Sequence, residues 1–281
     1  MRYTLHKLIE EFRADPDSPF ATLNHAVRAR QTRLYDRLIR EHGSLSLERI
    51  RTRDLMAWHR DWLGPGKVAI AHSLVTRLRV LFRYGDVMLE DRECRRPSAA
   101  LSNIRFEKPI LRSQPISDVQ INAFRDAARQ MGWESFALAQ AIQVDFRLTQ
   151  KNVIGIYVPA SAHIDTDVTH PEYGKWHDGL RWEDIDDKLN LQLRGRRRRT
   201  TLIGNLSKAP MVMQELAFYC HKPSDKITRE DLPRTGPIIL NEQTAFPFTT
   251  AEFRRKWRIV ADYAQLPKTI MNKDSKRLQP V

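Results

Sequence analysis

Residues 189–204 have the sequence LNLQLRGRRRRTTLIG, and this stretch limits the fold classes open to the whole chain. Leu189, Leu191 and Leu193 alternate with polar residues, which is the two-residue period of a β-strand with one buried face. The run Arg194–Arg199 would form a turn, and the residues after it would return as the antiparallel partner strand. We therefore predict a small antiparallel β-sheet at this point of the chain.

Helical periodicity dominates the sequence on both sides of this hairpin. Ser117 is a residue type that caps helices, and we predict helices after it, at 134–146, at about 207–219 and at 250–264. Upstream, the apolar spacing of residues 4–84 predicts a compact bundle of about four helices. The predicted fold class is therefore mainly α with a small antiparallel β-sheet.

Residues 94–115 differ in composition from the segments on either side. They contain three prolines and scattered basic residues, a composition typical of a linker. We therefore predict a helical domain at 1–95, a linker at 96–115 and a second, mixed α+β domain at 116–281.

The charge of the chain predicts a polyanionic partner. The formal net charge is +13 and the pI is about 10.0, with net +8 in residues 1–114 and net +5 in residues 115–281. Such a surface attracts nucleic acid, and arginines suit the phosphates and guanine edges of double-stranded DNA. The alternatives are a soluble protein of high pI and an RNA-binding protein, for which aromatic RNP-like motifs are missing. The predicted DNA contacts are Arg77, Arg79, Arg83, Arg194, Arg196, Arg198 and Arg199.

The sequence also excludes several classes of protein. No apolar stretch is long enough to span a membrane, and the first residues lack the apolar core of a signal peptide. Cys94 and Cys220 lie far apart, which predicts free thiols and a cytoplasmic location. None of the glycine-rich phosphate-binding patterns is present, so we expect no nucleotide cofactor.

Three histidines recur every seven residues in the polar stretch SAHIDTDVTHPEYGKWH. They are His163, His170 and His177, and histidine is a common metal ligand. The stretch has no tight ligand pair of standard spacing, so we predict a surface loop, with a metal site as the alternative.

Four stretches resemble a known family in their order and spacing. The resemblance is to the tyrosine recombinases, or phage-type integrases, and within them to an alphaproteobacterial branch. It implies that the first domain is a helical core-binding domain and that the second is a catalytic domain, the two forming a clamp around DNA. The stretches are AQAIQVDFRLTQKNVIGIYVP (139–159), GLRWEDID (179–186), APMVMQELAFY (209–219) and TAEFRRKWRIVADYAQLPKTIMNKDS (250–275).

The resemblance implies a reaction and a first catalytic residue. The family breaks and rejoins DNA strands, often of a mobile element, through a covalent phosphotyrosine and without a metal or nucleotide cofactor. The arginine that grips the scissile phosphate in the family corresponds to Arg147. The family's acidic residue three positions later is Gln150 here, whose amide can still orient an arginine. The alternative is that Arg147 forms a structural ion pair with Asp145 or another acid.

Two further catalytic positions follow from the resemblance. The family's lysine general acid on the hairpin turn corresponds to Arg197, and an arginine holds its proton too tightly for that role. The alternative for this turn is a solvated run of charges. The family's His-x-x-Arg box corresponds to 273–276, which puts Lys276 at the arginine position, with Arg277 as the neighbouring alternative.

No tyrosine follows Tyr263, so we expect a catalytic domain that is incomplete at its C-terminus, truncated near Lys276. Such a chain would bind DNA but would not cleave it alone. The alternatives are a non-catalytic regulator at integrase sites, acting with an intact recombinase or by self-association on DNA, and an inert remnant.

Overall fold

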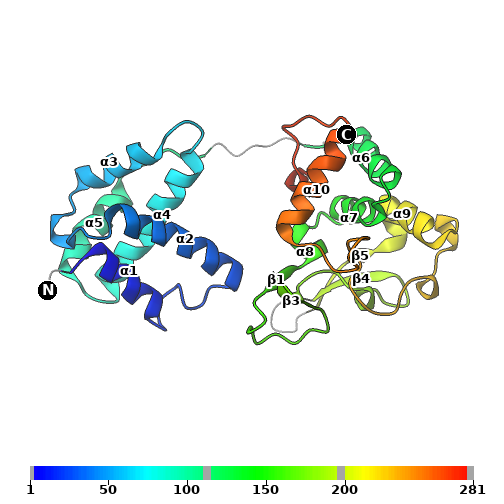
Figure 1. Cartoon of the computed structure of the whole chain (residues 1–281), viewed down its shortest axis with the longest axis horizontal. Coiled ribbons are helices and arrows are strands. Elements are labelled where there is room, and N and C mark those ends of the chain that lie inside the picture. Colours follow the sequence, from blue (N-terminus) through cyan, green and yellow to red (C-terminus); the bar gives the residue numbers. More distant parts are fainter. Residues whose placement is uncertain (1–2, 110–114, 195–199, 277–281) are drawn as a thin grey trace. The chain divides into compact units, whose positions relative to one another are not determined.

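The structure is a computed structural model that describes residues 3–109, 115–194 and 200–276. The chain divides into two compact units, Met1–Leu111 (unit 1) and Arg112–Val281 (unit 2) (Figure 1). Each unit has its own hydrophobic core. In the part of the chain that the structure describes, no helix is long and apolar enough to cross a membrane.

Unit 1 is a bundle of helices whose starts are set by side-chain caps. The Thr4 hydroxyl accepts a hydrogen bond from the Lys7 backbone N–H, and the Asn24 side chain accepts one from Val27. The apolar faces of the helices enclose a core that includes the fully buried Tyr35. The elements are α1 (Leu5–Ala14), α2 (His25–His42), η1 (Leu47–Arg49), α3 (Thr52–Trp62), α4 (Val68–Val87) and α5 (Arg92–Asn103).

The predicted linker at 96–115 is wrong over residues 96–103, because these residues continue α5. Pro97, which suggested the linker, lies inside this helix and is buried, as are Cys94 and Leu101. A composition rich in proline and arginine therefore concealed one apolar stripe at helical spacing.

Arg79, one of the predicted DNA contacts, is used inside unit 1. Its guanidinium donates to the carbonyl oxygens of Leu101 at 2.8 Å and Ile104 at 2.9 Å. These carbonyls belong to the end of α5, where no intrahelical donor is left for them. Arg79 therefore holds α5 against α4.

Gly85 is the point of closest approach between α4 and α5. A Cβ at this position would lie 2.4 Å from Cys94 Sγ and 3.2 Å from Leu8 Cδ1. We expect Gly85→Ala to lower the free energy of unfolding of unit 1 by about 1–3 kcal/mol, although alanine is the better helix former. Urea unfolding measures this loss of stability, and hydrogen exchange assigns it to α4 and α5. Gly64→Ala is the control, since its Cβ would lie 3.7 Å from the Lys67 side chain, and equal midpoints for both variants would contradict the prediction.

Unit 2 combines helices with two antiparallel sheets, one of order β1-β3-β2 and one formed by β4 and β5. Its helices are α6 (Asp118–Gln130), α7 (Glu134–Asp145), α8 (Gln150–Ile154), α9 (Pro210–Cys220) and α10 (Thr250–Tyr263). Its strands are β1 (Ile156–Val158), β2 (Thr169–His170), β3 (Gly174–His177), β4 (Asn190–Arg194) and β5 (Thr200–Asn205). Its short 3-10 turns are η2 (Trp182–Asp184), η4 (Leu206–Lys208), η5 (Ser224–Lys226), η6 (Arg229–Asp231) and η7 (Asn272–Lys276).

The predicted hairpin is confirmed, and with it the fold class. Strands β4 and β5 pair antiparallel, with Gln192 opposite Leu202, and Leu191 is buried against the core. The arginines Arg196, Arg197, Arg198 and Arg199 of the turn lie outside the described residues, and only the backbone of Arg194 is described.

The second sheet was not predicted, because a polar surface loop was expected where it lies. Its strands form around Trp176, which is 1% exposed and whose indole N–H donates to the Ile154 carbonyl at 2.8 Å. His170 lies on β2 and its ring stacks on that of Tyr173, while His177 lies 2.9 Å from Asp178. The predicted loop is therefore wrong for 169–170 and 174–177, which form β2 and β3. Within the described ranges, no three metal-ligating side chains come together.

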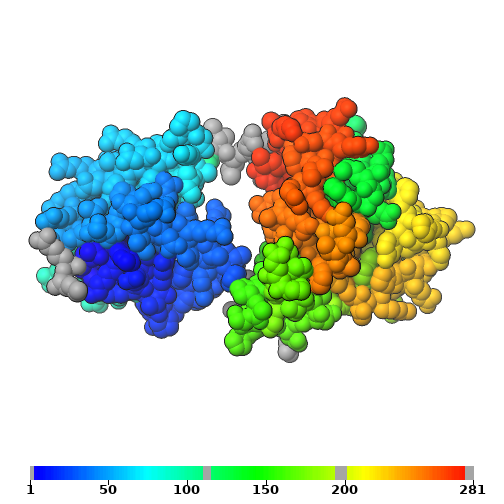
Figure 2. All heavy atoms as spheres, in the orientation of Figure 1, coloured from blue at the N-terminus to red at the C-terminus, as the bar shows by residue number. Residues whose placement is uncertain are grey.

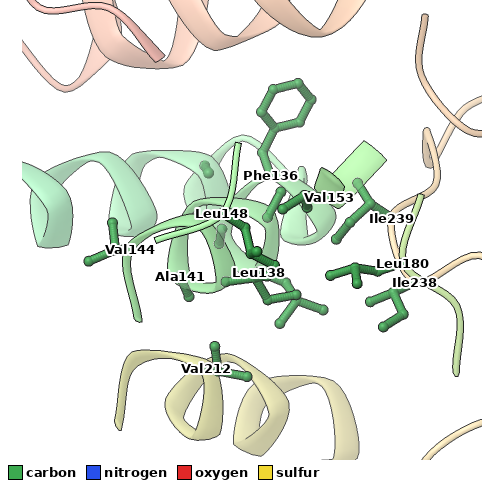
Figure 3. Close-up of a cluster of buried hydrophobic side chains, with 14 of the residues drawn as sticks. Phe136, Leu138, Ala141, Val144, Leu148, Val153, Leu180, Val212, Ile238 and Ile239 are labelled. Atoms are coloured by element: carbon green, nitrogen blue, oxygen red, sulfur yellow. The ribbon is translucent and has the colours of Figure 1, made fainter. Parts of the chain in front are cut away.

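Helix α7 runs through the core of unit 2. Residues 136–144 are all buried, as expected of a helix covered on every side. Figure 3 shows Val212 of α9 facing the side of α7 that carries Ala141, and Leu180, Ile238 and Ile239 near one end of the helix. Among these apolar residues α7 buries two amides, and both contribute to the site that follows.

Candidate functional site

A cavity of about 590 Å³ opens on unit 2 beside the end of α7. Its walls are residues 148–151 at the start of α8, the face of α10 from Thr250 to Arg258, and residues of the segment 268–273 that follows α10. Figure 2 shows the orange surface of α10 next to the red residues that follow it in the sequence. The cavity therefore joins segments about a hundred residues apart in the sequence.

The charged side chains in the lining of this cavity are all basic. Arg254 and Lys273 have no acidic partner among the residues that the structure describes. The Nη2 atom of Arg258 is buried without a hydrogen-bond partner in the same part of the chain. An unpaired buried guanidinium nitrogen is costly unless an anion or a water molecule satisfies it. The basic lining residues are Lys151, Arg254, Arg258, Lys268 and Lys273.

Two carboxylates outside the lining neutralise part of this charge. Asp178 lies 3.5 Å from Lys151, and Asp262 lies 2.7 Å from Lys268 and 3.6 Å from Arg258. These pairs are partly exposed, so each contributes little and does not compete strongly with a bound anion.

Arg147 lies on the turn that leads into this lining. It connects α7 to α8 with a φ of +52°, a left-handed conformation that costs a non-glycine residue of order 1 kcal/mol. Its side chain is exposed and forms no hydrogen bond or ion pair with any described residue. The turn itself is well supported, because the Thr149 hydroxyl caps α8 at Asn152 N–H. Arg147 is thus held in a strained backbone with its guanidinium open to solvent.

The two predicted partners of Arg147 are used elsewhere. Asp145 accepts a hydrogen bond from the backbone N–H of Val212 at 3.0 Å, and burial raises the pKa of this carboxyl. Gln150 donates to the Thr250 carbonyl at 3.2 Å, which ties α8 to α10. The structural pairing of Arg147 with Asp145 is therefore wrong, and so is the orienting role of the Gln150 amide.

The box at 273–276 is anchored on α7. Asn272 and Gln143 exchange two side-chain hydrogen bonds, of 2.9 and 3.4 Å. Ser275 and Gln140 are hydrogen-bonded at 3.0 Å. Lys273, between these anchors, is exposed on the cavity wall, whereas only the backbone of Lys276 is described.

The predicted DNA contacts of unit 1 lie on α4. Arg77 lines a groove between α2 and α4, of about 330 Å³, together with Arg30 and His72, and this lining contains no acidic residue. Arg83 is exposed one and a half turns further along α4. The basic groove was not predicted, although arginines recur along residues 28–40 of α2, which forms its other wall.

Most of the basic residues of the unit 2 cavity were missed by sequence reasoning. Arg254 and Arg258 occupy positions i and i+4 of a helix that was predicted correctly, so their common face could have been inferred. Lys151 and Lys268 carry no such signal, since only the tertiary fold brings their segments together.

No family model and no curated protein matches the chain, but solved structures of integrases match nearly all of it. A lambda integrase dimer bound to a COC′ core site has a TM-score of 0.66 at 13% identity over 98% of this chain and 68% of that one. A lambda integrase tetramer bound to a Holliday junction has a TM-score of 0.67 at 13% identity over 97% and 70%. The Tn1549 transposon integrase in complex with circular intermediate DNA has a TM-score of 0.53 at 13% identity over 98% and 84%. The chain therefore has the fold of these integrases.

Proposed function

We propose that this chain is an integrase-like protein of the tyrosine-recombinase type that binds duplex DNA, with the cavity of unit 2 gripping the phosphate backbone. The observation that carries the proposal is the charge of the cavity, whose charged lining is basic throughout. Arg147 supports it, because a guanidinium without a protein partner beside such a cavity suits a phosphate. The net charge of +13 supplies long-range attraction to DNA.

Unit 1 would add a second set of contacts in this proposal. The groove with Arg30 and Arg77 and the exposed Arg83 offer basic side chains on the same helical pair. A protein that holds DNA through two units neutralises more phosphates than either unit alone, and its affinity falls more steeply with salt. Arg194 and Arg196–Arg199 of the hairpin would extend the contact from unit 2.

We further propose that this polypeptide binds DNA without cleaving it. No described tyrosine lines the cavity, and burial raises the pKa of Tyr157 to about 12 while its hydroxyl donates to the Pro247 carbonyl at 2.9 Å. Tyr263 is exposed on α10 outside the lining. A nicked duplex that traps covalent intermediates tests this, and any adduct formed by the 281-residue polypeptide would overturn it.

A second candidate function is that of a regulator that occupies the DNA sites of an intact recombinase. The basic cavity, which has no tyrosine in its described lining, favours this function as well. The source would be a mobile element, and the partner an intact recombinase or a second copy of this chain. Gel shifts on integrase sites, with and without an intact recombinase, separate the two candidates. A regulator changes the occupancy or the activity of the recombinase, whereas a simple DNA-binding protein leaves both unchanged.

The role of Arg147 gives a direct test of the proposed contact. We expect Arg147→Ala to weaken duplex binding about 10-fold and to reduce the slope of log affinity against log salt by about one, because one phosphate contact is lost. Arg255→Ala is the matched control, since Arg255 is an exposed arginine of α10 outside the cavity. Equal losses from both variants would contradict a specific role for Arg147.

A further inference from the structure

Two buried amides of α7 connect this helix to the segment that carries Lys273. Gln143 is 1% exposed and Asn272 is 5% exposed, and each side chain both donates to and accepts from the other. One turn earlier, Gln140 accepts from the Trp257 indole N–H at 3.0 Å and is hydrogen-bonded to Ser275. Gln140 and Gln143 thus lie on one side of α7, where they are hydrogen-bonded to α10 and η7. These hydrogen bonds are called the amide ladder below.

Stability alone does not explain this ladder. Apolar side chains of similar size would fill the same space, and exchanging a buried hydrogen-bonded pair for apolar groups is often nearly neutral in free energy. A buried polar pair instead fixes one geometry, because any other arrangement leaves donors and acceptors unsatisfied. The reciprocal pair of Gln143 and Asn272 therefore specifies how η7 sits on α7.

This geometry controls where Lys273 lies relative to the end of α7. Lys273 directly follows Asn272, and Asn272, Asp274 and Ser275 around it are all buried, so their contacts set where Lys273 emerges. Gln143 precedes Arg147 by four residues on the same end of α7. The pair of Gln143 and Asn272 thus joins the wall that carries Lys273 to the last turn of α7, which the core already holds in place.

We propose that Gln143 and Asn272 are positioning residues that hold Lys273 opposite the Arg147 turn, so that both basic groups engage the same stretch of phosphate backbone. The inference rests on the proposed function, since it assigns these residues a part in DNA binding. It adds that the binding strength of Lys273 depends on two neutral side chains that touch no DNA.

The test measures duplex affinity over a range of salt concentrations for the whole chain. We expect Lys273→Ala and Gln143→Leu each to reduce the salt slope by about one, and the double variant to reduce it no further, because both changes remove the same contact. The exchange variant Gln143→Asn with Asn272→Gln keeps an amide pair of the same total length, and we expect it to restore most of the slope.

The outcomes separate the inference from the proposed function. If the unmodified chain shows no salt-dependent duplex binding, the proposed function fails. If it binds and Gln143→Leu keeps the original slope, or if the double variant loses the sum of both slopes, the positioning role is overturned. Asn272→Ala repeats the test from the η7 side in case Gln143→Leu does not fold, and circular dichroism identifies that case.

Discussion

Removing the carboxylate of Glu215 is expected to destabilise unit 2 by about 3–5 kcal/mol. Glu215 and Arg125 are each 3% exposed in their side chains and form a buried ion pair between α9 and α6, with a hydrogen bond of 2.6 Å. Glu215→Ala would leave the guanidinium of Arg125 buried without a counter-charge, and an uncompensated buried charge strongly destabilises the folded state. The midpoint of urea unfolding, with hydrogen exchange of α6 and α9, measures the loss.

The remaining contacts of Arg125 set the limit of this effect. Its guanidinium also donates to Asn122 at 3.0 Å, to Gln214 at 2.9 Å and to the Met211 carbonyl at 3.3 Å. These neutral acceptors satisfy its hydrogens but do not replace the negative charge. An effect below about 1 kcal/mol would show that Arg125 reaches solvent or another acid when Glu215 is gone.

Asp126→Ala is the matched control for the same cluster. Asp126 pairs with Arg129, which also contacts Glu215, but the Asp126 side chain is 59% exposed. An exposed pair of this kind contributes about 0.5 kcal/mol, so we expect a much smaller change in the unfolding midpoint. Similar losses for Glu215→Ala and Asp126→Ala would contradict the argument from burial.

The parts of the fold that the sequence predicts correctly are mostly those with a clear local period of apolar residues. Helix α10 and the β4–β5 hairpin have enough residues for a clear period, and both were found close to their observed bounds. The β1-β3-β2 sheet has strands of two to four residues, which are too short for a period of two to stand out. The sheet forms around the buried Trp176, and the local sequence does not indicate that this residue is buried.

The candidate site was harder to predict because its parts are joined only by tertiary structure. Arg147 was found through a resemblance, not through any property of its own neighbourhood. Gln143 and Asn272 are 129 residues apart, and in the sequence each is an ordinary polar residue. The pairing of Arg147 with Asp145 failed for a related reason, since the Asp145 carboxylate is used by the start of α9, 67 residues later.

Reversing two charges of the site is expected to have the largest effect on DNA binding. In the variant Arg147→Glu with Arg254→Glu, two groups that would donate to phosphates become groups that repel them. A hydrogen bond to a charged group contributes about 1.5–3 kcal/mol, so losing two should weaken duplex binding at least about 100-fold. Fluorescence anisotropy with a labelled duplex at fixed salt measures the change.

The control must remove the same net charge elsewhere on unit 2, because long-range attraction to DNA depends on total charge. Arg255 and Lys226 are exposed and lie outside the cavity lining, so Arg255→Glu with Lys226→Glu meets this need. We expect the control to weaken binding about 10-fold or less, with its effect vanishing at high salt. If both double variants lose affinity equally, DNA binds to the overall charge of unit 2 and the cavity has no special part in it.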